Sequence, residues 1–330
     1  MNSSLLFLPE LLLVASIMAI PALYIATENN KSYSICANIT LSLSLLLLVL
    51  FWFFPDEVSF EKNSSVYILY SHFKLDTFSQ LFKIIFVLTA LTVSVLSGSY
   101  FKEDEPHQAE YYTLLLSSTL GMMLVASATD FLTLFLGIEI SAFSSYAMVA
   151  FRKQDDKSTE AGAKYFLIGA FSSALTLYGI SLLYALTGSI TFEGMRSFFT
   201  GLNNEVVSGN FDEVIFISSL FILAGLGFKI AVVPFHAWAP DVYQGAPTPV
   251  TTLLAAGSKA MGFVALFRVF LFTMEAVSDE WRLILGIVAL ASMTIGNLAA
   301  ISQNDIGRML AYSSIAQAGY ILIAVPALPD

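Results

Sequence analysis

The sequence has little charge. Only 12% of its 330 residues are Asp, Glu, Lys or Arg, about half of the roughly 25% that soluble domains carry. The hydrophobic share is 57% and the mean hydropathy is +0.76. This composition excludes an ordinary soluble domain and is typical of a chain whose surroundings are lipid.

The sequence also lacks the residues that hold metals and redox groups. Cys36 is the only cysteine, which excludes an internal disulfide and an iron–sulfur cluster held by this chain alone. His72, His107 and His236 lie far apart, without metal-ligand spacing. Neither a dinucleotide-binding nor a phosphate-binding glycine motif is present. The net charge of −10 argues against nucleic acid. We expect no cofactor in this chain, no nucleic-acid partner and a surrounding lipid bilayer.

Apolar runs of about 20 residues, the length that crosses the hydrocarbon core, recur along the whole chain. They predict an all-α, polytopic transmembrane bundle of about ten spans that forms one integral membrane domain over residues 1–330. Lys and Arg are more frequent in the connections after odd-numbered spans, which predicts an N-terminus outside the cytoplasm. The expected spans are 5–26, 33–54, 75–97, 110–128, 130–150, 163–186, 213–235, 249–273, 281–302 and 306–327.

Ionisable residues inside these spans are the strongest functional signal, because a charge in hydrocarbon is costly. Glu139 lies near the middle of its span, and Lys229 lies five residues before Pro234. Lys259 lies ten residues into its span. Pro234 removes a helical hydrogen bond, so we predict a proline-broken helix near 213–240. A break at membrane depth is tolerated where it is buried in protein or lines a wet cavity, and Lys229 beside the freed carbonyls is placed for proton exchange through water. We interpret Glu139, Lys229 and Lys259 as a proton path. The alternatives are a protonated glutamate bonded to a neighbour and lysines that snorkel to helix ends.

Other ionisable residues give weaker signals. His236 suits a proton relay, although a helix-end histidine bonded to a carbonyl explains it nearly as well. Lys164 is either an interfacial anchor or the mouth of a proton path. We interpret Lys83 and Arg268 as snorkelling residues without a role. Asp241 is expected to cap a short helix or to bond backbone groups.

At these residues the sequence resembles a known family. The similarity extends through nearly the whole chain and is specific, because its motifs are long. The segments that carry it include FLGIEISAFSSYAMVAFRKQDDKSTEAGAKYFLIGAF, AGLGFKIAVVPFHAWAPDVYQGAPTPVTTLLAAGSKAMGF and ISQNDIGRMLAYSSIAQAGYILIA. These segments resemble the antiporter-like membrane subunits of the proton-pumping NADH:quinone oxidoreductase (bacterial respiratory complex I), subunit N in particular.

The resemblance implies inverted five-helix repeats, each with a broken helix. Residues 1–100 would be N-terminal helices, 110–273 the first repeat and 281–330 the start of an incomplete second repeat. Because family members have more spans, we expect a partial sequence. The residues that match functional positions of the family are the essential glutamate Glu139, the broken-helix lysine Lys229, the central lysine Lys259, the accessory residues His236 and Lys164, and Tyr312 near the central polar axis.

The resemblance also implies a function. The chain would conduct protons while other subunits pass electrons from NADH to quinone. NAD, FMN, iron–sulfur clusters and quinone would then be held by partner subunits, both membrane and peripheral, at the bacterial inner membrane, with a periplasmic N-terminus. One alternative is a subunit of a multisubunit cation/proton antiporter or of a membrane-bound hydrogenase. Another is a structural membrane spacer.

Overall fold

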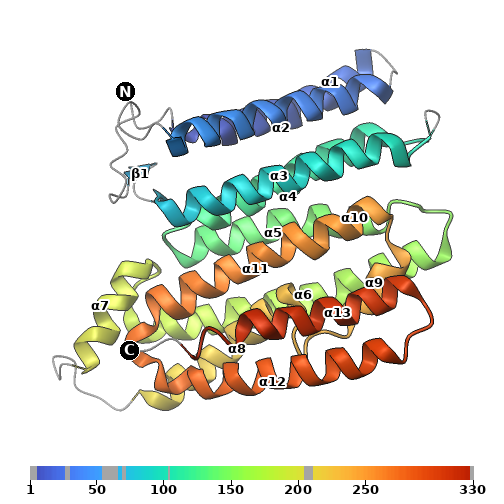
Figure 1. Cartoon of the computed structure of the whole chain (residues 1–330). Coiled ribbons are helices and arrows are strands. Elements are labelled where there is room, and N and C mark those ends of the chain that lie inside the picture. The colour runs from blue at the N-terminus through green and yellow to red at the C-terminus, as the bar shows by residue number, and fades with distance from the viewer. Residues whose placement is uncertain are drawn as a thin grey trace. The chain divides into compact units, whose positions relative to one another are not determined.

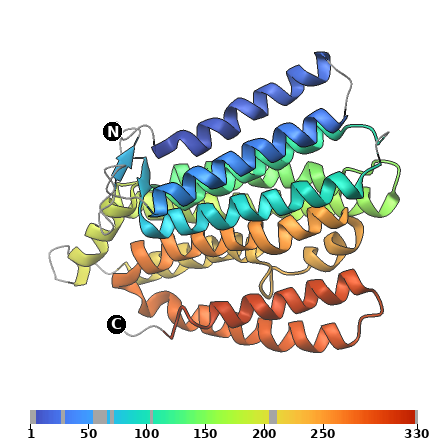
Figure 2. The same cartoon turned by 45° about the horizontal axis from the view of Figure 1, so that its top comes forward.

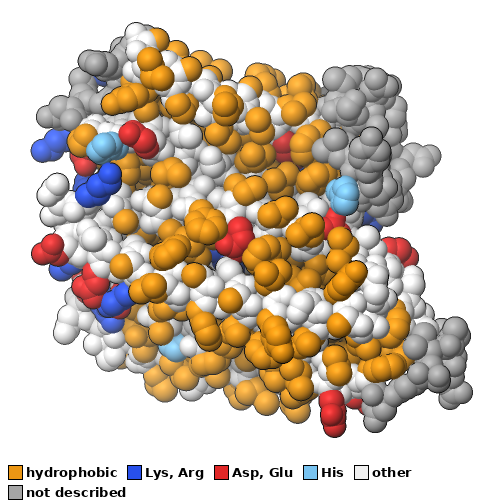
Figure 3. Space-filling model, turned by 180° about the vertical axis from the view of Figure 1, so that it is seen from behind, with side chains coloured by type: hydrophobic (Ala, Val, Ile, Leu, Met, Phe, Trp, Pro, Cys, Tyr) orange, Lys and Arg blue, Asp and Glu red, His pale blue; other side chains and the backbone are white. Residues whose placement is uncertain are grey.

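The predicted helical membrane fold is confirmed (Figure 1). The computed structural model describes residues 6–26, 30–53, 66–68, 72–102, 105–203 and 211–327. A helix coincides with each predicted span. By length and composition, 8 of the described helices can cross a membrane; α4 (Gln108–Ser127), which is richer in polar residues, and the 17-residue α13 (Ile306–Leu322) are not among them. On the face shown in Figure 3, hydrophobic side chains spread over the whole surface; most charged side chains lie near the left and right edges, and an acidic one lies near the centre.

The chain divides into two compact units that interleave in sequence. Unit 1 comprises Met1–Thr129, Thr133–Gln154 and Pro247–Met261, and unit 2 comprises Asp130–Leu132, Asp155–Ala246 and Gly262–Asp330. The division into 1–100, 110–273 and 281–330 stays a prediction. We describe each unit by itself.

Unit 1 is a helical layer with a short β-hairpin. α1 packs against α2 and α4, and α3 packs against α2, α4 and α10; α1, α2 and α3 run side by side (Figure 2). The strands pair antiparallel, with Tyr67 opposite Lys74. The elements are α1 (Leu8–Ala26), α2 (Asn30–Phe53), β1 (Val66–Ile68), β2 (Phe73–Leu75), α3 (Thr77–Tyr100), α4, α5 (Phe131–Val149), α10 (Thr248–Leu253) and the π-helical turn η3 (Leu254–Ser258).

Small residues let α4 and α5 touch at their backbones. A Cβ atom added at Gly121 would lie 2.6 Å from the Gly137 carbonyl oxygen, which leaves no room for a side chain. Beside this crossing, Ser118 Oγ lies 3.0 Å from Ser141 Oγ, so the two hydroxyl groups hydrogen-bond between the helices. Close backbone contact and interhelical hydroxyl bonds are how helices associate where lipid supplies no hydrophobic driving force.

Unit 2 is built around α6, which packs against α8 and α9; α13 packs against α9 and α12. α7 lies at the end of α6 and η4 (Figure 1). The elements are α6 (Asp156–Thr187), α7 (Phe192–Asn203), α8 (Asp212–Ile230), α9 (Trp238–Gly245), α11 (Lys259–Leu266), the π-helical η4 (Phe267–Thr273), the 3₁₀ turn η5 (Glu275–Val277), α12 (Asp279–Ile301) and α13.

Glycine sets the spacing of α12 and α13, and it yields a first prediction. A Cβ at Gly296 would lie 2.7 Å from the Ala316 backbone nitrogen, whereas nothing lies within 4 Å of a Cβ at Gly286 on the same helix. Gly296→Ala should therefore force the helices apart and lower the free energy of unfolding by about 1–3 kcal/mol. Gly286→Ala should be neutral or slightly stabilising. Thermal unfolding of the two variants in detergent measures the difference; equal melting temperatures would refute the packing argument.

Candidate functional site

The predicted helix break is present in unit 2. α8 ends at Ile230, four residues before Pro234, and α9 begins at Trp238. Ala231 adopts the left-handed conformation with φ 55°, and its N–H donates to the Gly227 and Phe228 carbonyls. The chain therefore leaves helical geometry inside a run whose composition is apolar. A break at membrane depth is tolerated only where protein or water satisfies the backbone groups it frees.

Side chains from neighbouring helices satisfy the groups at this break. The Val233 N–H donates to Ser292 Oγ of α12 at 2.9 Å. The indole Nε1–H of Trp238 donates to the Phe228 carbonyl, at the end of α8, at 3.0 Å. The Trp238 ring also stacks on Tyr165 of α6, with ring centroids 4.5 Å apart. The interrupted segment is thus held by both hydrogen bonds and aromatic packing.

Lys229 lies in the last turn of α8, directly before the break. Its exposure is 4%, so it does not snorkel to the surface. A cation is favoured there by the C-terminal end of the helix dipole. Gly262 of α11 packs against it, since a Cβ at Gly262 would lie 3.2 Å from Lys229 Cβ. The chain has therefore placed a long basic side chain in the interior at the point where a helix is interrupted.

The cavity beside the break is apolar rather than lined by charge. It has a volume of about 210 Å³. Its walls come from α6, α8 and residues 234–237, and include Phe171, Phe228, Pro234 and Phe235. Ser172 is its polar member among the described lining residues, and the Ser172 hydroxyl donates to the Gly225 carbonyl at 3.1 Å. Of the two surroundings that allow a break at membrane depth, burial in protein is the one that these apolar walls favour.

Two of the predicted relay residues come together in unit 2. His236 lies in the broken segment and Tyr312 on α13, with ring centroids 6.5 Å apart. Lys164 is not part of this pair. It lies near the start of α6 and belongs to an ionic cluster with Asp241. In unit 1, Glu139 is partly buried on α5, and Lys259 is buried at the start of α11, directly after η3. Single π-helical turns of this kind recur at functional sites.

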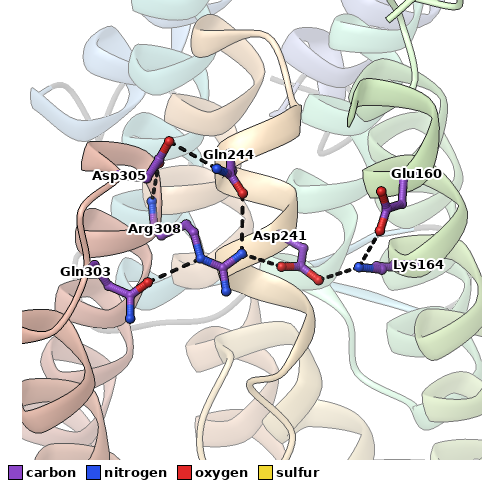
Figure 4. Close-up of polar contacts among 7 residues, drawn as sticks. All are labelled: Glu160, Lys164, Asp241, Gln244, Gln303, Asp305 and Arg308. Atoms are coloured by element: carbon purple, nitrogen blue, oxygen red, sulfur yellow. Dashed lines mark hydrogen bonds and ion pairs between the residues drawn. The ribbon is translucent and has the colours of Figure 1, made fainter. Parts of the chain in front are cut away.

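The cluster around Lys164 joins α6, α9 and α13 (Figure 4). We call it the Asp241 cluster; its members are Glu160, Lys164, Asp241, Gln244, Gln303, Asp305 and Arg308. Lys164 Nζ lies 2.7 Å from Asp241 Oδ2 and 2.7 Å from Glu160 Oε1. Arg308 Nη1 lies 2.5 Å from Asp241 Oδ1. Each carboxylate oxygen of Asp241 therefore faces one cation, from two different helices.

Amide side chains complete the cluster. Arg308 Nε donates to Gln303 Oε1 at 3.2 Å, and Gln244 Nε2 donates to Asp305 Oδ2 at 3.1 Å. Asp305 caps α13, because its Oδ1 accepts the Arg308 backbone N–H. Burial alone would raise the pKa of Asp241, but the hydrogen bonds from Lys164 and Arg308 outweigh it and hold that pKa below its ordinary value. Asp241 stays ionised between its two partners.

Three sequence interpretations are wrong. Asp241 makes no cap, because its carboxylate bridges Lys164 and Arg308 instead. Lys83 does not snorkel: it is fully buried and lies 2.5 Å from Glu10. Arg268 is also buried, at 5% exposure, with its guanidinium 5.7 Å from the Phe272 ring centre. Within the described residues, no group of three or more His, Cys, Asp and Glu is placed to hold a metal ion.

The Asp241 cluster yields a second prediction. Asp241→Asn leaves two cations without the anion between them, so the free energy of unfolding should fall. Because the three charged side chains are 29–42% exposed, the expected loss is only about 1 kcal/mol, and it should shrink in high salt. Glu275→Gln, which breaks the more exposed Arg196–Glu275 pair, serves as the control and should change stability by less than about 0.5 kcal/mol.

Thermal unfolding measured at several pH values checks in which direction the stabilisation by Asp241 changes with pH. The folded-state pKa of Asp241 is lowered, so its contribution is present above the unfolded-state value of about 3.9. That contribution should disappear as the pH falls further, through the folded-state pKa. A pH-independent difference between the wild-type protein and Asp241→Asn over this range would contradict the assignment.

Comparison with known proteins agrees with this architecture. The family described as "NADH:quinone oxidoreductase/Mrp antiporter, TM" matches residues 128–328. F(420)H(2) dehydrogenase subunit N of Methanosarcina mazei is 39% identical over 319 residues, which are 96% of this chain and 62% of that protein. NADH-quinone oxidoreductase subunit N of Erythrobacter litoralis is 38% identical over 330 residues, 99% of this chain and 65% of that protein.

A solved structure agrees as well. A chain of respiratory complex I from Thermus thermophilus superposes with a TM-score of 0.77 at 32% identity, over 96% of this chain and 64% of that one. The chain thus spans less than two thirds of the length of these relatives. Fold, family match and relatives coincide: the chain belongs to the NADH:quinone oxidoreductase/Mrp antiporter family of membrane proteins.

Proposed function

We propose that this chain conducts protons across the membrane as the N-type subunit of an NADH:quinone oxidoreductase. The observation that carries the proposal is Lys229, which is buried in the last turn of a helix that breaks immediately afterwards. A buried ionisable residue beside interrupted backbone is the arrangement that transporters use at their ion sites. Glu139 and Lys259 complete the proposed path.

The mechanism we propose is electrostatic switching. Burial lowers the proton affinity of a lysine, and a nearby carboxylate raises it again. When the charge of Glu139 acts on Lys229, the lysine keeps its proton; when that charge is drawn away, the proton passes on to Lys259. Moving one charge against the membrane potential costs about 2.3 kcal/mol per 100 mV, so the coupling between these groups has to be of at least that order.

The remaining predicted residues serve as a relay in this proposal. His236 and Tyr312, whose ring centroids lie 6.5 Å apart with the planes tilted by 58°, would exchange a proton through an intervening water molecule. Lys164 lies in the part-exposed Asp241 cluster, which suits the wet mouth of the path rather than its dry centre. Asp241 holds Lys164 in place and keeps its ammonium group charged.

Redox chemistry belongs to partner subunits in this proposal. NAD, FMN, iron–sulfur clusters and quinone would be held by other membrane and peripheral subunits of the complex. The complex would lie in a bacterial inner membrane, with the N-terminus of this chain on the periplasmic side. Electron transfer in the partners would supply the change in charge that releases the proton from Lys229.

A second electron donor has a specific observation in its favour. The relative from Methanosarcina mazei, which is 39% identical over 96% of this chain, is a subunit of F(420)H(2) dehydrogenase. The same proton path would then be driven by oxidation of F(420)H(2) instead of NADH. The family description also includes Mrp antiporters; Na⁺-dependent proton flux without oxidation of a donor would favour that class.

The proposed function yields a third prediction. Glu139→Gln removes the charge that acts on Lys229 while keeping the size of the side chain. Assembly and donor oxidation should persist, and the number of protons moved per electron should fall by more than half. Membrane vesicles report this number through the quenching of a pH-sensitive dye. Glu110→Gln, at a side chain that is 51% exposed, is the matched control and should pump as the wild type.

A native gel of gently solubilised membranes comes before that measurement. Comigration of this chain with NADH-oxidising activity supports the proposed complex, and comigration with F(420)H(2)-oxidising activity supports the second donor. Normal proton pumping in an assembled Glu139→Gln complex would contradict the switching mechanism. Migration as a separate particle without dehydrogenase activity would favour an antiporter.

A further inference from the structure

A buried acid–base pair lies in unit 1, outside the residues that the proposed path uses. Glu10 is in the first turn of α1 and Lys83 is in the second turn of α3. Lys83 Nζ lies 2.5 Å from Glu10 Oε1, and the two side chains are 0% and 1% exposed. Both residues precede the segment 128–328 that the family match covers.

Apolar side chains lie close to this pair. The Phe7 ring centre lies 6.0 Å from Lys83 Nζ, and Phe7 belongs to a hydrophobic cluster built from the residues before α1, the end of α2 and β2. The cluster comprises Leu6, Phe7, Leu47, Phe51, Phe73 and Leu75. The Ser44 hydroxyl of α2 donates to the Pro9 carbonyl at 3.4 Å. The ionic contact between Lys74 of β2 and Asp76, the cap of α3, is part-exposed.

Stability alone does not account for such a pair. Two charges taken from water cost several kcal/mol each, and apolar side chains of similar volume at the same place are commonly neutral or stabilising. α1 already packs through apolar residues such as Leu13 and Ile20, which are fully buried. An ionisable residue inside a membrane span is functional more often than structural. A pair retained under these conditions points to proton chemistry.

We infer that Glu10 and Lys83 form a proton-exchange site. The proton crosses the contact between Lys83 Nζ and Glu10 Oε1: one N–H bond breaks, one O–H bond forms, and an ammonium–carboxylate pair becomes an amine and a carboxylic acid. The net charge of the pair is zero in both states, so no uncompensated charge is ever buried. Only the separation of charge changes. The pair is therefore a two-state element that an electric field within the protein biases.

The inference rests on the proposed function, because proton conduction elsewhere in the chain supplies the moving charge. When a positive charge advances along the path, the field at Glu10 and Lys83 changes and the shared proton shifts between them. The shift feeds back on the path by the same electrostatic coupling, since coupling between two sites is reciprocal. The site would thus set how strongly protons are retained at one stage of the cycle.

Lys83→Arg is the fourth prediction and tests this step directly. A guanidinium remains protonated in proteins, so Lys83→Arg keeps the ion pair with Glu10 but cannot give up its proton. Assembly and donor oxidation should persist, and protons moved per electron should fall by more than half. Lys74→Arg, at the part-exposed Lys74–Asp76 contact, is the matched control and should leave this ratio unchanged.

A double variant separates proton exchange from packing. Glu10→Leu with Lys83→Met replaces the pair by apolar side chains and should assemble. Proton exchange predicts the same loss of pumping as Lys83→Arg, whereas a structural pair predicts wild-type pumping. Wild-type pumping in either assembled variant overturns the inference. Lys229→Met is the reference for the proposed function. If Lys229→Met also pumps normally, the proposed function is wrong. If Lys229→Met loses pumping while the Glu10 and Lys83 variants keep it, only the inference about Glu10 and Lys83 is wrong.

Chemical labelling of the wild-type complex tests the inference even if none of the variants assembles. Dicyclohexylcarbodiimide reacts with protonated carboxyl groups in apolar surroundings. Peptide mass spectrometry after treatment should find Glu10 modified during donor oxidation and far less modified at rest. Equal modification, or none, in the two conditions would show that the carboxylate does not take up the proton.

Discussion

The hydrocarbon core of a membrane offers no hydrogen-bond partner, and this constraint governs the structure. Many hydroxyl side chains on the described helices donate to a carbonyl of their own helix, as when Thr119 donates to the Leu115 carbonyl and Ser145 to the Ser141 carbonyl. The break after α8 is possible because Ser292 and Trp238 take up the groups that it frees. In an interrupted helix without those partners, the buried backbone groups would cost several kcal/mol of uncompensated desolvation.

The same constraint made much of the fold predictable. Runs that avoid polar residues marked the helices to within a few residues, as for the predicted 281–302 and the observed Asp279–Ile301. Pro234 marked the break because a missing N–H has a fixed local consequence. The π-helical turns around Lys259 were not predictable. A shift from i+4 to i+5 hydrogen bonds depends on packing with other helices and leaves no sign in composition.

Individual charges were predictable, but their partners were not. The sequence shows that Lys229 and Lys259 lie in apolar runs, and both are buried as that position implies. It does not show that Asp241 faces Lys164, 77 residues away, and Arg308, 67 residues away. Lys83 was misinterpreted for the same reason, since snorkelling is the default for a lysine near a span end unless a buried carboxylate meets it.

The two ionic sites differ in a way that decides what each can do. The Asp241 cluster is part-exposed, so water and salt screen it, and exchanging one of its protons with solvent changes local charge at small cost. Glu10 and Lys83 are not exposed to water with which they could exchange protons. Any uncompensated charge there would carry the full desolvation energy. Proton movement at a wet cluster therefore tracks the pH of one aqueous phase. Movement within a dry pair responds instead to the electric field inside the protein, which is the quantity that a charge advancing along Lys229 and Lys259 would change.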